Sequence, residues 1–156
     1  MTPPPGIRIR RLAAHDKPGW LALFRAYITF YQASVAGDVI DETFRRLLSG
    51  EEGFHIGYVA VDESGTPVGL AHVLFHRSTW SKTWYCYLED LFVRPDIRGK
   101  GIGKALIAEV LAESGRRGAT RTHWTTQEFN YRARSLYDQM ATKAPFVQYR
   151  CEHPVR

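Results

Sequence analysis

Three closely spaced glycines follow a short apolar segment in the middle of the chain and open an amphipathic segment. The apolar segment covers residues 91–93, the glycines are Gly99, Gly101 and Gly103, and the predicted helix covers residues 102–117. A helix that begins at such a turn presents unpaired backbone N–H groups and the positive end of its dipole at one place. That place binds anions, and glycines let a phosphate approach the backbone closely. The sequence therefore predicts a strand, an anion-binding turn and a helix, in this order.

Basic side chains surround the turn, but its spacing differs from that of two common phosphate-binding loops. Arg98, Lys100 and Lys104 add positive charge to the anion site. In a nucleoside-triphosphate loop a Ser or Thr follows the Gly-Lys pair and holds magnesium, whereas here Ala105 follows Lys104. A dinucleotide loop has the spacing G-x-G-x-x-G, whereas this turn has G-x-G-x-G. Neither class fits, and a pyrophosphate is the expected ligand.

The rest of the chain contains further strand and helix patterns. Alternating or continuous apolar runs with aromatic residues predict strands, and apolar residues three or four positions apart predict helices. The predicted strands cover residues 7–12, 54–61, 68–75, 84–93, 120–126 and 146–151, and the predicted helices cover residues 18–33, 42–48, 102–117 and 131–141. The length of 156 residues is typical of one domain. We expect a single α+β domain over residues 1–156, with the proline-rich residues 1–6 disordered.

Three motifs, taken in order, resemble the GNAT superfamily of N-acetyltransferases. Arg98-x-x-Gly101-x-Gly103 resembles the turn that holds the pyrophosphate of coenzyme A, and residues 87–93 and 130–137 resemble the segments on either side. The branch with polyamine and histone-type acetyltransferases is the most similar in appearance. The resemblance implies a GNAT fold, with a central, mixed, mostly antiparallel twisted sheet of six to seven strands flanked by about four helices. It also implies strands that splay around the glycine turn, and acetyl-CoA-dependent N-acetyltransfer.

The resemblance further implies how the cosubstrate acetyl-CoA is held. In the superfamily, the backbone of the strand before the turn pairs with the pantetheine arm as an additional strand would. The turn holds the pyrophosphate, and an asparagine and a tyrosine further along the chain contact the coenzyme. Asn130 also suits the N-cap of a helix. The expected cofactor-binding residues are Leu91, Phe92, Val93, Arg98, Gly99, Lys100, Gly101, Ile102, Gly103, Lys104, Asn130 and Tyr137.

Direct acetyl transfer to an amine needs one base and one acid. An alkyl amine, with a pKa of about 10, must lose a proton before it attacks, and the leaving thiolate, with a pKa of about 8.5, gains one. Glu89 is the candidate base, acting through water; the alternative is that its charge is only solvated at the end of a strand. Asp90 is a second carboxylate that could hold the ammonium. Because side chains alternate along a strand, only one of the two is expected to face the substrate unless a bulge intervenes. The resemblance makes Tyr137 the acid, although Tyr137 also continues an apolar helical stripe.

The identity of the acceptor amine is left open by the sequence. Aromatic faces attract ammonium groups, so Tyr27 and Trp80 are candidate substrate-binding residues beside Glu89 and Asp90. Core packing also explains aromatic residues at these positions. The acceptor could be a polyamine-like or lysine-like primary amine of a small molecule or peptide, or a protein N-terminus. A catalytically silent coenzyme A-binding regulatory module is the non-enzymatic alternative.

Charge and cysteine content set the remaining expectations. The net charge of +5 favours an anionic partner such as coenzyme A, and no nucleic-acid-binding motif is recognisable. Cys86 and Cys151 belong to no metal-binding pattern, so no metal is expected. No apolar run is long enough to span a membrane, and we expect a cytoplasmic protein. By resemblance the protein forms a homodimer, for which the strand predicted over residues 146–151 offers an edge.

Overall fold

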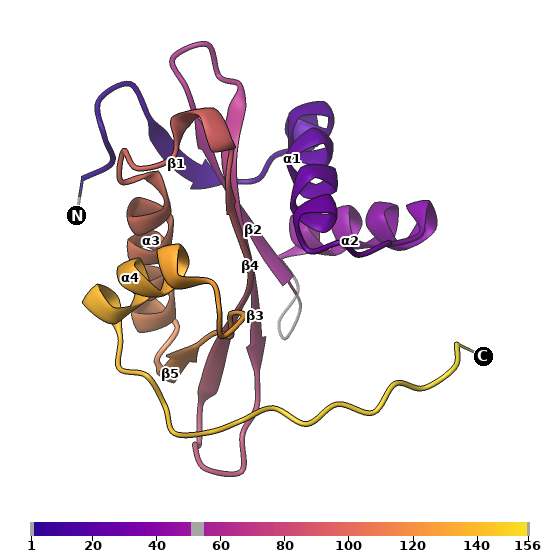
Figure 1. The fold of residues 1–156 in the computed structure, drawn as a ribbon, viewed down its shortest axis with the longest axis vertical. Coiled ribbons are helices and arrows are strands. Elements are labelled where there is room, and N and C mark those ends of the chain that lie inside the picture. Colours follow the sequence, from indigo (N-terminus) through magenta and orange to yellow (C-terminus); the bar gives the residue numbers. More distant parts are fainter. Residues whose placement is uncertain (1, 51–54, 156) are drawn as a thin grey trace. The chain divides into compact units, whose positions relative to one another are not determined.

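The computed structural model describes residues 2–50 and 55–155, which divide into two compact units, one ending at Thr125 and one beginning at Thr126 (Figure 1). The second unit contains helix α4 (Tyr131–Met140). The first unit contains β1 (Arg8–Arg11), α1 (Lys17–Phe30), α2 (Gly37–Ser49), β2 (His55–Val61), β3 (Pro67–His76), β4 (Trp84–Val93), α3 (Ile102–Arg116) and β5 (Ala119–His123), with short 3-10 turns at Ala14–Asp16 and Pro95–Ile97. The expectation of one domain with residues 1–6 disordered stays a prediction.

The strands of the first unit form one mixed sheet in the order β1-β2-β3-β4-β5. The first four strands are antiparallel neighbours, and β4 and β5 are parallel. This arrangement confirms the predicted α+β fold class and the mostly antiparallel sheet. The sheet has five strands rather than the expected six to seven. Most predicted elements agree with the observed ones, although α2 begins at Gly37 instead of residue 42 and β5 ends at His123 instead of residue 126.

The strand predicted over residues 146–151 is wrong. Residues 142–155 form neither helix nor strand, and no strand of the described residues pairs with them. The apolar side chains of this segment are almost fully exposed: Phe146 at 84%, Val147 at 80% and Tyr149 at 92%. A strand is defined by hydrogen bonds to a neighbouring strand, and the apolar spacing of one segment carries no information about such a neighbour. The sequence pattern therefore predicted a strand for which the described residues supply no partner strand.

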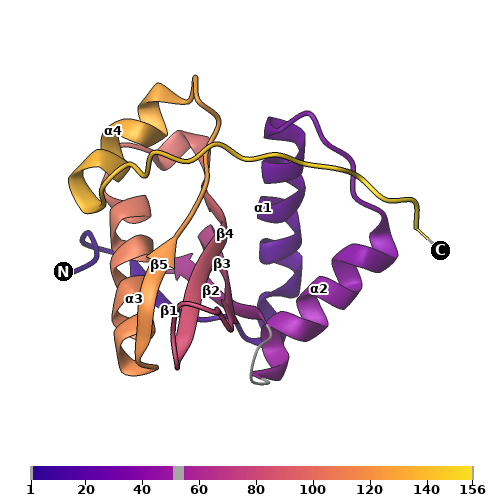
Figure 2. The same cartoon turned by 90° about the horizontal axis from the view of Figure 1, so that it is seen from below.

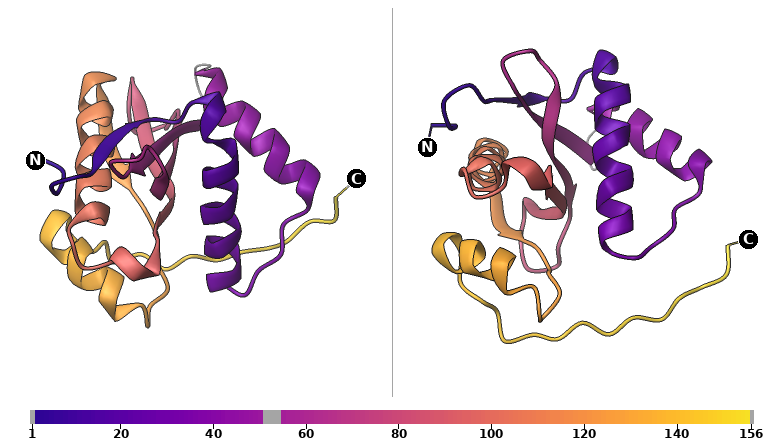
Figure 3. Two further views of the ribbon diagram at one scale, coloured as in Figure 1. Left: turned by 90° about the horizontal axis from the view of Figure 1, so that it is seen from above. Right: turned by 45° about the horizontal axis from the view of Figure 1, so that its top comes forward.

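Helices cover both faces of the sheet in the first unit. Helices α1 and α2 lie on one face, and α3 lies on the other (Figures 2 and 3). Trp20 and Phe24 of α1 and Phe44 of α2 are buried against the first face, whereas Ile102 and Leu106 of α3 are buried against the second. Burying each such side chain contributes about 1.5–3 kcal/mol to folding. The sheet is therefore held between two apolar layers, and β4 is fixed in position on both sides.

An ion pair between a half-buried arginine and a buried aspartate fixes the connection between β1 and α1. Arg10 donates to both carboxylate oxygens of Asp16, at 2.6 and 2.9 Å, and the backbone N–H of Ala13 donates to Oδ2 at 2.8 Å. Burial alone raises the pKa of Asp16, but these hydrogen bonds outweigh it and hold the pKa below its usual value. The Asp16 side chain is only 1% exposed, so its charge depends on these partners. This contact fixes where α1, which carries Trp20, Phe24 and Tyr27, begins.

Candidate active site

The glycine turn before α3 is open to an anion. Gly99 and Gly101 have φ angles of +80° and +85°, which strain any residue with a Cβ atom. Nothing lies within 4 Å of a Cβ placed on Gly99, and Pro4 Cγ lies 3.8 Å from one placed on Gly101. Gly101 is the N-cap of α3, no side chain caps the helix, and no acidic residue occurs in its first turn. The turn therefore has the unpaired amides, the open space and the charge that a pyrophosphate needs.

Arg98 is held in place beside this turn. Its Nε donates to the carbonyl oxygen of Val93 at 2.8 Å, which ties the turn to the end of β4. Its guanidinium lies over the ring of Phe92 at 5.1 Å and over that of Phe30 at 5.7 Å. Ile102, by contrast, is buried in the core, so only its backbone is available to a ligand. The turn thus combines a fixed cation with exposed main-chain donors.

The strand that leads into the turn has one open edge. β5 pairs in parallel with β4 only from Trp84 to Tyr87. Beyond Tyr87, within the described residues, β4 pairs only with β3, where Leu91, Phe92 and Val93 lie opposite Ala71, Leu70 and Gly69. The backbone groups on the other edge of residues 91–93 therefore have no strand partner. This is the splay that the resemblance predicted around the turn.

β4 contains a bulge at Glu89. Asp90 lies opposite His72 of β3, but Leu88 lies opposite Val73, so Glu89 is the extra residue between two regular pairs. In a regular strand, residues 89 and 90 would face opposite sides of the sheet. A bulge bends the strand and redirects the side chain. As a result Glu89 and Asp90 both line one cavity, which is the exception that a bulge was expected to produce.

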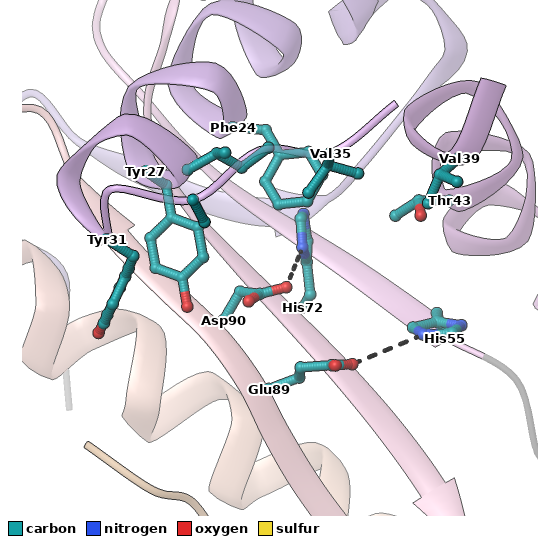
Figure 4. Close-up of a pocket in the computed structure, with 12 residues that line it drawn as sticks. Phe24, Tyr27, Tyr31, Val35, Val39, Thr43, His55, His72, Glu89 and Asp90 are labelled. Carbon is teal, nitrogen blue, oxygen red and sulfur yellow. Dashed lines mark hydrogen bonds and ion pairs between the residues drawn. The ribbon is translucent and has the colours of Figure 1, made fainter. Parts of the chain in front are cut away.

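The cavity lies between α1, α2 and the bulged part of β4 and has a volume of about 320 Å³ (Figure 4). This volume suits a small molecule. Most of its wall is apolar or aromatic, and the two carboxylates give it negative charge. The lining residues are Phe24, Tyr27, Ile28, Tyr31, Ala33, Val35, Val39, Thr43, His55, His72, Glu89 and Asp90.

Each carboxylate in the cavity has a histidine beside it. His72 Nδ1 lies 2.8 Å from Asp90 Oδ2, and His55 Nε2 lies 3.7 Å from Glu89 Oε2 (Figure 4). The Glu89 side chain is 45% exposed, whereas that of Asp90 is 17% exposed, so the two have different access to water. Burial, and then the negative charge of Asp90, raise the pKa of the Tyr31 phenol. The cavity therefore combines an aromatic wall with an anionic wall, which is the arrangement that attracts an organic cation.

Comparison with known proteins identifies the family. Residues 20–141 match the acetyltransferase (GNAT) family. The chain is a GNAT acetyltransferase. It is 30% identical over 145 residues to a D-amino-acid N-acetyltransferase of Saccharomyces cerevisiae, with 92% of this chain and 89% of that protein covered. It is 29% identical over 144 residues to the thialysine N-epsilon-acetyltransferase of Bos taurus, with 88% and 84% covered.

A solved structure agrees in fold. The ribosomal-protein-alanine N-acetyltransferase of Brucella melitensis biovar Abortus 2308 superposes with a TM-score of 0.78 at 22% identity, with 94% of this chain and 99% of that chain covered. Together with the family match, this confirms the GNAT fold and an acetyl-CoA-dependent N-acetyltransferase. No helix in the described part of the chain is long and apolar enough to cross a membrane. Residues 2–50 and 55–155 also contain no group of three or more His, Cys, Asp or Glu side chains arranged to hold a metal ion.

The structure brings together some of the residues that we predicted for the acetyltransferase site. Glu89, Asp90 and Tyr27 line the cavity. Trp80 lies in the connection between β3 and β4, is 86% exposed and is not among the lining residues, so its acceptor-binding role stays a prediction. Asn130 accepts a hydrogen bond from the backbone N–H of Ala133 at 3.4 Å and is the N-cap of α4.

Tyr137 belongs to the second unit, on α4, and its role as the acid stays a prediction. The apolar residues of its helix, Ala133, Leu136, Tyr137 and Met140, are half-buried and none is fully buried, so the packing role remains beside the catalytic one.

The two histidines of the cavity were not predicted as site residues of the acetyltransferase. His55 and His72 reach the carboxylates from β2 and β3, the two strands of the hairpin beside β4. His72 contacts Asp90 only because the register of β3 and β4 places the two residues opposite each other. No local sequence signal reports that register, and the bulge alters it within the site. These residues could be found only from the strand pairing.

Proposed function

We propose that this GNAT acetyltransferase transfers the acetyl group of acetyl-CoA directly to a primary amine of a small molecule, and that the amine is remote from any carboxylate. The observation that carries the proposal is the bulge at Glu89. It directs two neighbouring carboxylates into a cavity beside the open edge of β4, and that edge leads to the glycine turn. An amine that enters the cavity would meet acceptors for its ammonium protons near the place where the thioester is expected.

The proposed chemistry is a single displacement. Glu89 removes one proton from the ammonium through a water molecule, the amine nitrogen attacks the thioester carbonyl, and the carbon–sulfur bond breaks as the carbon–nitrogen bond forms. The thiolate takes a proton, for which Tyr137 is the proposed donor by resemblance. Residues 91–93 would hold the pantetheine arm, and the amides of residues 98–104 would hold the pyrophosphate.

Charge in the cavity favours one class of amine. An α-amino acid carries its carboxylate on the carbon next to the amine, so acetylation of the α-amine would bring that carboxylate close to Glu89 and Asp90. Like charges about 5 Å apart near a protein surface repel by about 3 kcal/mol before screening by solvent. A side-chain amine, such as that of lysine or thialysine, or one end of a diamine, avoids this repulsion. The relative that acts on thialysine is therefore the better guide to the acceptor than the relative that acts on D-amino acids.

Thiol release tests the proposal. Purified protein is incubated with acetyl-CoA and a panel of diamines, thialysine, lysine, D-amino acids and lysine-containing peptides, and free coenzyme A is measured. We expect higher kcat/KM for diamines and side-chain amines than for D-amino acids. A preference for peptides would instead indicate a protein acetyltransferase. Binding of coenzyme A without thiol release on any acceptor would indicate a regulatory module and would refute the proposal.

A matched pair of variants tests the base. Glu89→Gln keeps the shape of the side chain and removes its basicity, so we expect kcat to fall by about 100-fold, the usual contribution of a general base. Raising the pH should partly restore the rate of this variant, because a larger fraction of the amine is then already deprotonated. Thr43→Ser is the control, since it changes the cavity wall without changing a titratable group.

We also propose that the protein is a cytoplasmic homodimer. The exposed apolar residues of the C-terminal segment, Phe146, Val147 and Tyr149, are the surface proposed for pairing. Both cysteines are free thiols, which suits a reducing compartment. Light scattering should give a particle mass of two chains for the full-length protein. A protein that ends at residue 141 should give the mass of one chain. A monomeric full chain would refute the dimer.

A further inference from the structure

A chain of three side chains runs from the core to the cavity. The indole Nε1–H of Trp20 donates to His72 Nε2 at 2.8 Å, and His72 Nδ1 lies 2.8 Å from Asp90 Oδ2. Trp20 is 0% exposed and His72 is 1% exposed, so water does not complete the hydrogen bonds of either ring. The three residues come from α1, β3 and β4 and are 52 and 18 positions apart in the sequence.

The hydrogen bonds assign the proton on His72. An indole N–H can only donate, so the His72 Nε2 atom that receives it must be without a proton. A proton on Nε2 would place two buried N–H groups against each other at 2.8 Å. His72 is therefore neutral, with its proton on Nδ1, and that Nδ1–H donates to the Asp90 carboxylate. Trp20 thus determines which end of the imidazole faces Asp90.

The rings around this chain leave it little freedom to rotate. The Phe24 ring packs edge-on against His72, with 5.0 Å between the ring centroids. Trp20 also contacts Phe44, at 4.9 Å between centroids. A histidine that only accepted from Trp20 would still need an acceptor for its buried Nδ1–H, and here that acceptor is a carboxylate that lines the cavity.

We propose that Trp20 and His72 are positioning residues that hold the Asp90 carboxylate as the binding site for the acceptor ammonium, which leaves Glu89 as the base. This inference rests on the proposed acetyl transfer to a small-molecule amine. An ionised carboxylate can accept about four hydrogen bonds, and His72 uses one of these positions on Oδ2. The other positions remain for the N–H groups of the substrate ammonium. Asp90 is held and little exposed, as an anchor requires, whereas Glu89 is 45% exposed and can pass a proton to water.

Two variants of His72 with the same branching test the donor. In His72→Asn the side-chain amide can place an N–H near the position of Nδ1, whereas His72→Leu has a similar shape and no donor. Both variants remove the acceptor for Trp20 and leave a similar cavity, so both should lose similar stability in urea unfolding. We expect His72→Leu to raise KM for the amine at least tenfold, with KM for acetyl-CoA changed less than threefold. His72→Asn should restore KM for the amine to within about threefold of the wild-type value.

A spectroscopic measurement tests the chain without reference to activity. Long-range ¹H–¹⁵N spectra of the wild-type protein should show His72 protonated on Nδ1 and unprotonated on Nε2. Trp20→Phe keeps an aromatic ring and removes the N–H that holds Nε2 without a proton, so the ¹⁵N signal of Nε2 should shift in this variant while Nδ1 stays protonated against Asp90. Trp20→Phe also serves as the test variant if the His72 variants do not fold. A His72 that carries its proton on Nε2 in the wild type would overturn the proposal.

The outcomes distinguish the positioning role of Trp20 and His72 from the proposed acetyl transfer. If the wild type acetylates amines but His72→Leu and Trp20→Phe leave KM for the amine unchanged, the positioning role falls and the proposed function stands. If the wild type releases no thiol with any amine, the proposed function falls, and with it the role of Asp90 as an anchor.

Discussion

Substitution of Gly101 by aspartate should abolish most of the affinity for coenzyme A while leaving the fold intact. Gly101 is the N-cap of α3, and the space around its missing Cβ atom is open, with Pro4 Cγ at 3.8 Å. Asp is a preferred N-cap residue whose carboxylate accepts hydrogen bonds from the first amides of a helix. In Gly101→Asp the protein would therefore place its own anion on the amides proposed to hold the pyrophosphate. The left-handed backbone, with φ of +85°, is tolerated by Asp better than by most residues.

The expected loss of affinity for coenzyme A in Gly101→Asp is the sum of two effects. A carboxylate about 5 Å from one phosphate charge repels it by about 3 kcal/mol at an effective dielectric constant of about 20. Because the turn is exposed, solvent screening reduces this to about 1–2 kcal/mol. Loss of one amide contact to a charged group adds about 1.5 kcal/mol. The sum of about 3 kcal/mol raises Kd for coenzyme A by roughly 100-fold. Gly101→Asn adds similar bulk without charge and should raise Kd by roughly tenfold.

Isothermal titration calorimetry with coenzyme A measures these differences. Gly118→Asp is the control, because Gly118 also has a positive φ, of +69°, and open space around it, but follows the C-terminal end of α3. It introduces the same charge and similar backbone strain, so its unfolding midpoint should fall while Kd stays within threefold. The difference between Gly101→Asp and Gly101→Asn should shrink in about 1 M salt. A folded Gly101→Asp that binds coenzyme A within threefold of the wild type would refute the assignment of the turn.

Three further predictions concern other residues. Tyr137→Phe should lower kcat at least about 100-fold and leave Kd for coenzyme A within threefold, because only a proton donor is lost; stopped-flow and calorimetry measure the two quantities. Burial raises the pKa of Cys86 to about 11, so iodoacetamide at about pH 8 should label one thiol, Cys151, until the protein is unfolded, which mass spectrometry reports. Its hydrogen-bond partners hold the pKa of Asp16 in the folded protein below the usual value of 3.8. The ion pair with Arg10 therefore stabilises the fold at a pH above 3.8, and this stabilisation is lost as the pH falls through the lower pKa of the folded state. Asp16→Asn should accordingly cost about 2–3 kcal/mol in urea unfolding at pH 7 and less at low pH.

Local patterns in the sequence were sufficient for most of the fold. The apolar spacing that predicted α1 and α3 is the spacing that buries Trp20 and Leu106 on opposite faces of the sheet. The glycine turn was predictable because its backbone geometry requires particular residue types, glycine at positions 99 and 101, and because its charge comes from a basic residue, Arg98. The strand predicted over residues 146–151 failed because strand formation depends on a partner elsewhere, and the apolar pattern reports only what one segment offers.

The cavity was less predictable because it depends on contacts between distant segments. Glu89 and Asp90 could be named from the motif, but whether both face one cavity depends on a bulge that is a property of the pairing with β3. His72 lies in a continuous apolar strand, where a histidine gives no indication of its partners. Its hydrogen bonds to Trp20 and Asp90 appear only when α1 is packed on the sheet.

The bulge at Glu89 connects the acceptor side of the site to the coenzyme side. Regular pairing of β4 with β5 ends at Tyr87, immediately before the irregular part of the strand. A bulge increases the local bend and twist of its strand, so the segment that follows diverges from a neighbour that does not share the bulge. One inserted residue thus accounts both for the two carboxylates in the cavity and for the open edge over residues 91–93. Deletion of Glu89 should therefore impair more than the base, because Leu88 and Asp90 would then pair regularly with Val73 and His72, the strand would lose its bend, and β5 could continue pairing towards the turn. In such a variant the affinity for coenzyme A should fall along with turnover, whereas Glu89→Gln, which keeps the bulge, should reduce turnover alone.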